Sequence, residues 1–250
     1  MKSEKKTIDI NCDMGEGIGN DELIMPYVSS ANIACGYHAG DVNTMQQTVQ
    51  LCKKYNVAVG AHPSFPDKAN FGRTDMQLHP GEIYEMIVKQ INCLEKIAEE
   101  NDMPVHHVKP HGALYNMAAR DKALAPFVAL AILDTNSKYI LYGLSGSYLI
   151  KEGKNLGVKT ANEVFADRTY KDDGSLTSRA KPGALIEETD KTVAQVLQMI
   201  KEGTVTSING KKIPIIAETI CIHGDGEHAV EFAKAIREAL TKEGIEIRAK

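Results

Sequence analysis

Residues 7–17 read TIDINCDMGEG, and this stretch shows the pattern on which the fold prediction rests. A short run that is rich in β-branched residues is followed at once by acidic residues and glycines. β-Branched residues favour strands, and glycines permit tight turns. We therefore expect a strand over residues 7–12 whose end carries the reactive side chains Asp13 and Glu16.

The same pattern recurs along the chain. We expect further strands at residues 31–35, 57–61, 105–108, 139–143, 158–165 and 215–222. Segments with a 3.6-residue apolar period lie between most of them, as in Val42, Met45, Val49 and Cys52. Such spacing is typical of amphipathic helices. The alternation of strands and helices predicts an α/β fold with a parallel sheet and right-handed crossovers.

The placement of polar residues favours a closed barrel over an open sheet. Reactive side chains follow nearly every expected strand: Asp13, Glu16, His38, Asp41, His62, Lys109, His111, Glu163, Asp167, Arg168 and His223. In a parallel barrel all these strand ends emerge at one mouth, where barrel enzymes build their active sites, whereas an open sheet spreads them along a line. We therefore expect a TIM-barrel-like (β/α) barrel.

The chain shows no composition break, linker or repeat, so we expect one domain over residues 1–250. One departure from the alternation lies at residues 205–216, where two short β-like runs flank Asn209-Gly210. This pattern predicts a β-hairpin with a type I′ turn, inserted just before the last barrel strand.

Composition excludes several classes of protein. The 29 Lys and Arg residues nearly balance 33 Asp and Glu residues, for a net charge of −4, so we expect no nucleic-acid partner. The N-terminal MKSEKKTID has no apolar segment behind it, and the longest apolar run, 127–133, is far shorter than the ~20 residues that span a bilayer. Five cysteines without a Cys-x-x-Cys pair fit a reducing compartment. We expect a cytoplasmic protein with no membrane partner.

Several candidate residues also have a purely structural interpretation. Asp41 and Asp225 each precede a helical segment and are equally well explained as helix N-caps. Cys12 and Cys35 are better explained as small core residues than as nucleophiles. Four of the eight histidines, however, follow strands (His38, His62, His111 and His223), which favours a functional role.

A metal site is open at this stage. Asp13, His38 and His62 come from successive strands and could form a three-ligand catalytic zinc site with one position for water. No H-E-x-x-H motif supports it. The chain also lacks a P-loop and a strand-linked G-x-G-x-x-G, so we expect that it does not bind ATP through either of these motifs.

Six sequence blocks together resemble the LamB/YcsF family over residues 8–225. They are DINCDMGEG (9–17), SANIACGYHAGD (30–41), GAHPSFPD (60–67) with FGR (71–73), KPHGALYN (109–116), EVFADRTY (163–170) with DGSL (173–176) and SRAKPGA (178–184), and ICIHGD (220–225). The resemblance implies a seven-stranded barrel of the glycoside hydrolase/deacetylase type. It also implies a role as the A subunit of a prokaryotic 5-oxoprolinase, which works with 5-oxoprolinase subunits B and C to convert 5-oxo-L-proline to L-glutamate while the complex consumes ATP.

The resemblance suggests a division of labour among the candidate residues. We hypothesise that the partner subunits phosphorylate the lactam oxygen and that this chain adds water at the carbonyl carbon. Asp13 is then the expected base, His38 and His62 orient the water or hold a divalent metal, and His111 and His223 are the acid candidates. The expected substrate-binding residues are Glu16, Asp41, Lys109, Glu163, Asp167 and Arg168, of which Lys109 and Arg168 bind the substrate carboxylate or phosphate.

Two alternatives remain at this stage. One is a metal-dependent deacetylase of N-acetyl sugars, and the other is a non-catalytic protein that binds 5-oxoproline or acts as a scaffold for its partners.

Overall fold

The computed structural model describes residues 6–224, 226 and 228–250, so Asp225 lies outside the described residues. Ten strands are present in this part of the chain. They are β1 (Thr7–Met14), β2 (Ser30–Ala34), β3 (Ala58–His62), β4 (Val105–Val108), β5 (Ile140–Leu144), β6 (Lys159–Phe165), β7 (Thr204–Thr206), β8 (Lys212–Pro214), β9 (Thr219–Ile222) and β10 (Glu246–Ile247).

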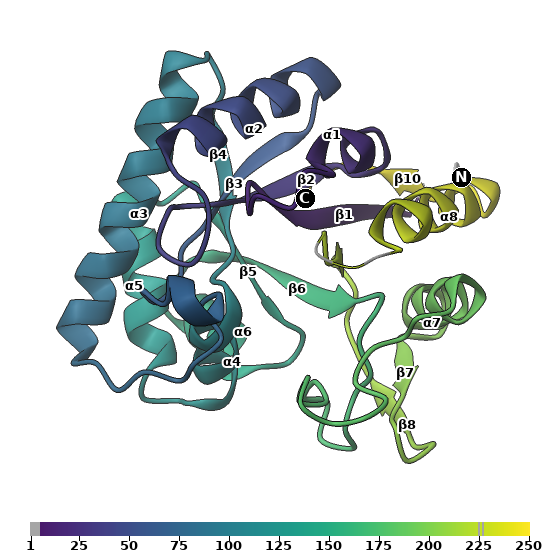
Figure 1. Cartoon of the computed structure of the whole chain (residues 1–250). Coiled ribbons are helices and arrows are strands. Elements are labelled where there is room, and N and C mark those ends of the chain that lie inside the picture. Colours follow the sequence, from purple (N-terminus) through teal and green to yellow (C-terminus); the bar gives the residue numbers. More distant parts are fainter. Residues whose placement is uncertain (1–5, 225, 227) are drawn as a thin grey trace, which may run out of the picture.

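Seven parallel strands close into a barrel (Figure 1). Their order is β1-β2-β3-β4-β5-β6-β9, and β9 pairs in turn with β1 through Asp9↔Thr219 to Cys12↔Ile222. The short strand β10 pairs only with the start of β1. The closed seven-stranded (β/α) barrel confirms the expected fold class.

Strand β1 shows why the barrel has a polar interior. Its apolar residues Ile8, Ile10, Cys12 and Met14 are all buried and belong to the hydrophobic core. The alternate residues Asp9, Asn11 and Asp13 are buried too, and they bond across the barrel to polar side chains of other strands. Since successive side chains of a strand point to opposite faces, β1 places one apolar face outward and one polar face inward.

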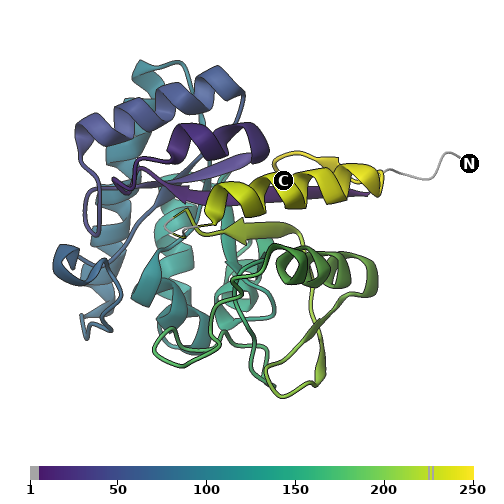
Figure 2. The same cartoon turned by 45° about the vertical axis from the view of Figure 1, so that its right-hand side comes forward.

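The helices cover the outside of the barrel. They are α1 (Asp21–Ile24), α2 (Val42–Tyr55), α3 (Pro80–Glu100), α4 (Gly112–Arg120), α5 (Ala125–Thr135), α6 (Tyr148–Asn155), α7 (Thr189–Glu202) and α8 (Ala229–Lys242), with short 3₁₀ helices at Met25–Tyr27 and Lys68–Asn70. In Figure 1, α2 to α6 lie around the left of the barrel and α7 and α8 around its right, and Figure 2 shows the same arrangement turned by 45°. Within the described ranges, no helix combines the length and apolar character needed to cross a bilayer.

Strands β7 and β8 form a separate antiparallel pair that projects beside α7 (Figure 1). The expected type I′ turn is wrong, because Gly210 has a φ of +80° but Asn209 is not among the described residues with positive φ. Gly210 N donates to Ser207 O and Ser207 N donates to Lys211 O, which makes a three-residue loop. The Ser207 hydroxyl also accepts from Asn209 N and Lys211 N, and this side-chain capping favours the longer loop.

Candidate active site

A cavity of about 790 Å³ opens at the end of the barrel where the carboxyl ends of the strands meet. Six of the residues expected at the site line it: Asp13, His62, Lys109, His111, Arg168 and His223. Asp13 and His62 lie in β1 and β3, and the others come within three residues of the ends of β4, β6 and β9. The parallel topology therefore brings residues from both ends of the sequence to one mouth.

Lys109 is the ionic centre of the site. It is buried, and its Nζ lies 2.9 Å from Asp13 Oδ1, 2.9 Å from Glu163 Oε1 and 3.0 Å from Cys221 Sγ. Burial alone would lower the pKa of Lys109, but the neighbouring Asp13, Cys221 and Glu163 raise it well above its ordinary value. Lys109 is therefore a permanent cation at the floor of the cavity.

Asp13 is held as a carboxylate. Its Oδ1 accepts from Lys109 Nζ and from Asn32 Nδ2, which is 2.8 Å away, and its Oδ2 lies 3.4 Å from His62 Nε2. Burial would raise the pKa of Asp13, but its interactions with the neighbouring His62 and Lys109 outweigh it and hold this pKa well below its usual range. Asp13 can therefore orient a water molecule without first losing a proton.

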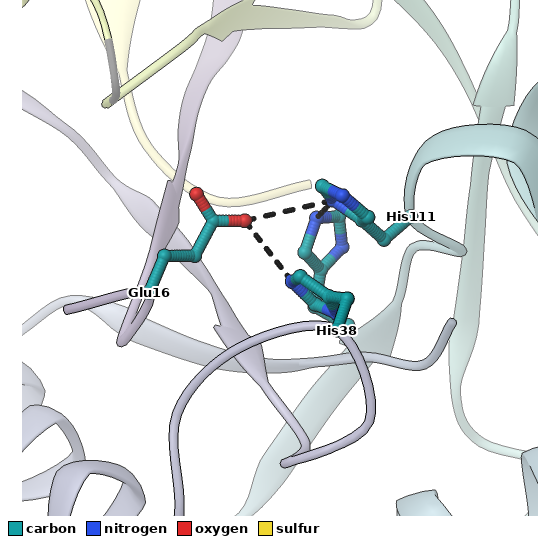
Figure 3. Close-up of side chains that lie close together, drawn as sticks. Glu16, His38 and His111 are labelled. Carbon is teal, nitrogen blue, oxygen red and sulfur yellow. Dashed lines mark hydrogen bonds and ion pairs between the residues drawn. The ribbon is translucent and has the colours of Figure 1, made fainter. Parts of the chain in front are cut away.

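Three histidines and Glu16 form a compact group beside Asp13. His62 Nε2 lies 2.9 Å from His111 Nδ1, and Glu16 Oε1 lies 3.1 Å from His38 Nε2 and 3.5 Å from His111 Nδ1. The rings of His38 and His111 are stacked, with centroids 3.8 Å apart. Figure 3 shows the Glu16 carboxylate facing both rings. Burial lowers the pKa of His38 to about 3 and that of His111 well below its ordinary value, so both rings are neutral near pH 7.

The loop after β3 fixes this group in place. Phe71 and Gly72 both have left-handed backbone conformations, with φ of +55° and +64°. Phe71 O accepts from His111 Nε2 at 2.9 Å. A Cβ on Gly72 would lie 2.8 Å from His38 Cβ, so only glycine lets the loop pass so close over the histidines.

His223 and Asp167 form a second unit at the mouth. His223 Nδ1 lies 2.9 Å from both carboxylate oxygens of Asp167, and the His223 ring stacks on Phe165. A carboxylate accepts the Nδ1 proton, so Nε2 is the nitrogen left to exchange a proton with substrate. Burial would raise the pKa of Asp167, but His223 outweighs it and the pKa falls.

The far wall of the cavity is suited to an anion. Arg168 is buried there, and its Nη2 donates to Thr177 O at 2.5 Å. Within the described part of the chain, Arg168 Nε and Thr177 Oγ1 have no hydrogen-bond partner, although both are buried. Arg179 and Lys171 also line this wall. Burial lowers the pKa of Arg168 to about 10, which still leaves it charged at neutral pH.

Besides Glu16, which faces the histidines, three expected substrate-binding residues lie outside the cavity lining and have other contacts. Asp41 is exposed and caps α2, since its Oδ1 accepts from Thr44 N at 2.8 Å, and it does not line the cavity. Glu163 is fully buried and bonds to Lys109 and to Tyr115 OH, at 2.6 Å. Asp167 faces His223. Glu163 and Asp167 thus position other site residues.

Several residues that build the site were not expected from the sequence. Asn32 and Tyr115 bind the carboxylates, Ser64 binds His38, and Thr177 and Arg179 line the anion-binding wall. Four of the five lie within the sequence blocks quoted above and Thr177 lies between two of them, but polar residues of these types occur widely in loops and strands. Only their contacts distinguish them.

Comparison with known proteins decides the family. Residues 8–250 match the model of the LamB/YcsF family. The chain belongs to the LamB/YcsF family. It is 51% identical over 250 residues to a Brevibacillus brevis protein named as the A subunit of 5-oxoprolinase, covering 98% of both chains.

Solved structures agree with this assignment. The LamB/YcsF chain superimposes on a lactam utilization protein from Thermus thermophilus with a TM-score of 0.91 and 40% identity, covering 98% of this chain and 100% of that one. The peptidoglycan deacetylase PdaC from Bacillus subtilis shares only the fold, with a TM-score of 0.50 and 14% identity over 99% of this chain and 89% of that one. A deacetylase thus has a fold similar to this barrel.

Proposed function

We propose that this chain is the A subunit of an ATP-dependent 5-oxoprolinase and catalyses the opening of the lactam ring. The observation that carries the proposal is the 51% identity to a relative of that name over 98% of both chains. The cavity fits this reaction, because it places a fixed cation, a carboxylate and a histidine around one small volume.

Ring opening of the activated lactam adds water at the carbon that carries the phosphorylated oxygen. The water oxygen bonds to this carbon, the C–N bond breaks with its electrons moving to nitrogen, and nitrogen takes up protons. The open product is an acyl phosphate, which a second water hydrolyses to the carboxylate of glutamate and inorganic phosphate. Asp13 orients the attacking water and receives its proton, while His223, held by Asp167, protonates the departing nitrogen. Lys109 stabilises the negative charge that develops on the tetrahedral intermediate.

The anion-binding wall gives this reaction its substrate preference. 5-Oxoproline carries a carboxylate, and a phosphorylated lactam carries a phosphate as well. Arg168 has a buried Nε–H aimed at no protein acceptor among the described residues, and guanidinium groups bind both anions in a forked geometry. We assign the substrate carboxylate or phosphate to this wall.

Activation of the lactam is assigned to partner subunits B and C. An amide is resonance-stabilised, and ring opening requires coupling to ATP. This chain has neither a P-loop nor a strand-linked G-x-G-x-x-G, which is consistent with ATP being held by a partner. The complex is expected to work in the cytoplasm.

Reconstitution tests the proposal. The purified chain, incubated with 5-oxoproline and ATP, should form glutamate only when subunits B and C are also present. His223→Asn should lower that rate by about 10²–10⁴-fold, the usual contribution of a general acid. Asp102→Asn is the matched control, because Asp102 is exposed, has a left-handed φ of +55° that Asn tolerates, and lies outside the cavity. Absence of glutamate from a folded, assembled wild-type complex would refute the substrate assignment.

A further inference from the structure

The group formed by Glu16, His38, His62 and His111 has an unusual arrangement of protons. Each histidine has one ring nitrogen against an atom that can only accept from it. His62 Nδ1 lies 2.7 Å from Lys109 O, and His111 Nε2 lies 2.9 Å from Phe71 O. A carbonyl oxygen has no proton to give, so these two nitrogens carry the N–H.

The same reasoning fixes the proton of His38. Ser64 Oγ donates its one proton to Phe65 O at 3.0 Å. It therefore accepts from His38 Nδ1, which is 2.8 Å away. In the neutral ring, the remaining His38 Nε2 bears a lone pair.

The three remaining nitrogens and the Glu16 carboxylate converge on one small volume. His62 Nε2 lies 2.9 Å from His111 Nδ1. Glu16 Oε1 lies 3.1 Å from His38 Nε2 and 3.5 Å from His111 Nδ1, as Figure 3 shows. A single divalent cation among these four atoms could be bound by all of them together.

We propose that Glu16, His38, His62 and His111 bind one divalent transition-metal ion, with Zn²⁺ the best match. All four donor atoms lie within 4.8 Å of one another and all four residues are buried. Tetrahedral Zn²⁺ with bonds of about 2.0–2.2 Å sets its donors about 3.3–3.6 Å apart, and imidazole with carboxylate is a typical zinc ligand set. The acceptors behind the histidines, Lys109 O, Phe71 O and Ser64 Oγ, are the outer contacts that orient metal-binding imidazoles.

This ligand set differs from the Asp13, His38 and His62 trio expected from the sequence. Asp13 Oδ1 is occupied by Lys109 Nζ at 2.9 Å, and Glu16 and His111 complete the group instead. Since His62 and His111 also line the cavity, the ion would border the substrate space and could polarise a carbonyl or a water molecule there.

A second group of close donor atoms, from Asp13, Cys221 and His223, is less suited to bind a metal ion. The Lys109 ammonium lies 2.9 Å from Asp13 Oδ1 and 3.0 Å from Cys221 Sγ, so a cation already fills the space. Asp167 also engages His223 Nδ1. These two groups make different predictions, because only the second contains sulfur.

The test uses the full chain, stripped with a chelator and titrated with ZnCl₂ alone. Calorimetry should give about one Zn²⁺ per chain, and X-ray absorption should show only N/O ligands at about 2.0–2.2 Å. His111→Asn should weaken binding at least 100-fold. Ser64→Ala, which removes only the acceptor behind His38, should weaken it about 10–100-fold. His223→Asn should bind Zn²⁺ like the wild type.

The outcomes separate metal binding from the proposed reaction, because no partner protein or substrate is present. Circular dichroism and thermal melting establish that each variant is folded. The proposal is overturned if the folded wild type takes up no Zn²⁺, or if X-ray absorption shows a sulfur ligand at about 2.3 Å. It is also overturned if His223→Asn loses Zn²⁺ binding while His111→Asn keeps it. If His111→Asn does not fold, the Ser64→Ala result decides.

Discussion

Asp9 and Asp13 lie four residues apart on β1 and are both buried inside the barrel, yet their surroundings differ completely. Asp9, near the amino end, accepts from three hydroxyl groups: Ser29 at 2.6 Å, Ser30 at 2.8 Å and Thr219 at 2.6 Å. Asp13, near the carboxyl end, faces Lys109 and His62.

The difference separates a structural role from a functional one. Burial raises the pKa of Asp9, whereas neighbouring charges hold the pKa of Asp13 below its usual range. Hydroxyl groups stabilise the amino end without fixing a charge, and the carboxyl end maintains ions next to a cavity. The barrel thus keeps its chemistry at one end, as parallel barrels generally do.

The largest effect is expected from Lys109→Met. It leaves Asp13 and Glu163 as buried carboxylates without their cation, and breaking a buried ion pair costs about 3–5 kcal/mol. Chemical denaturation of the isolated chain measures this loss. Adding Glu163→Gln should recover part of the stability but none of the activity. If Lys109→Met alone were as stable as the wild type, Asp13 and Glu163 would not be held as ions.

A smaller loss of stability is expected from Gly60→Ala, a substitution in the middle of β3. Gly60 lies where a Cβ would come within 2.1 Å of His107 Nε2, which contacts Asn32 Oδ1 at 2.8 Å. Asn32 in turn donates to Asp13. Gly60→Ala should therefore cost about 1–3 kcal/mol, as overpacking does, and should also lower activity by displacing Asn32. Gly157→Ala is the control: its Cβ meets nothing within 4 Å, and although its φ of +81° adds strain, activity should persist.

The pH dependence of stability should distinguish Asp9 further. The pKa of Asp9 in the folded state lies above 3.8, so the folded state retains a proton that the unfolded state has already released. The stability of the wild type relative to Asp9→Asn should then be greatest below about pH 4 and fall as the pH rises through the folded value. Denaturation of both proteins between about pH 3.5 and 7 measures the difference. A rise with pH would contradict a raised pKa.

The smallest effects are expected at Asp41. It caps α2 from an exposed position, and Asn is an equally good cap, so Asp41→Asn should change stability by less than about 0.5 kcal/mol. Asp41→Ala should cost about 1 kcal/mol. Neither should change activity of the assembled complex. A large activity loss in Asp41→Asn would return this residue to the substrate site.

The strands and their reactive ends could be predicted because they depend on local patterns. Apolar runs that end in Asp, His and Gly mark the barrel strands, and parallel topology places those ends at one mouth. The pairing of His62 with His111 could not be predicted, because it joins residues 49 positions apart through a loop with two left-handed residues. Asp41 shows the converse error, since an N-cap and a site residue look alike in the sequence.

One measurement tests the difference between the two ends most directly. Glutamate formation is compared in complexes assembled with Asp13→Asn and with Asp9→Asn. We predict a loss of at least about 100-fold for Asp13→Asn, as expected for a general base, and a rate within about threefold of wild type for Asp9→Asn. Near-normal activity of Asp13→Asn, or equal losses in both folded variants, would contradict the assignment of the chemistry to the carboxyl end of the barrel.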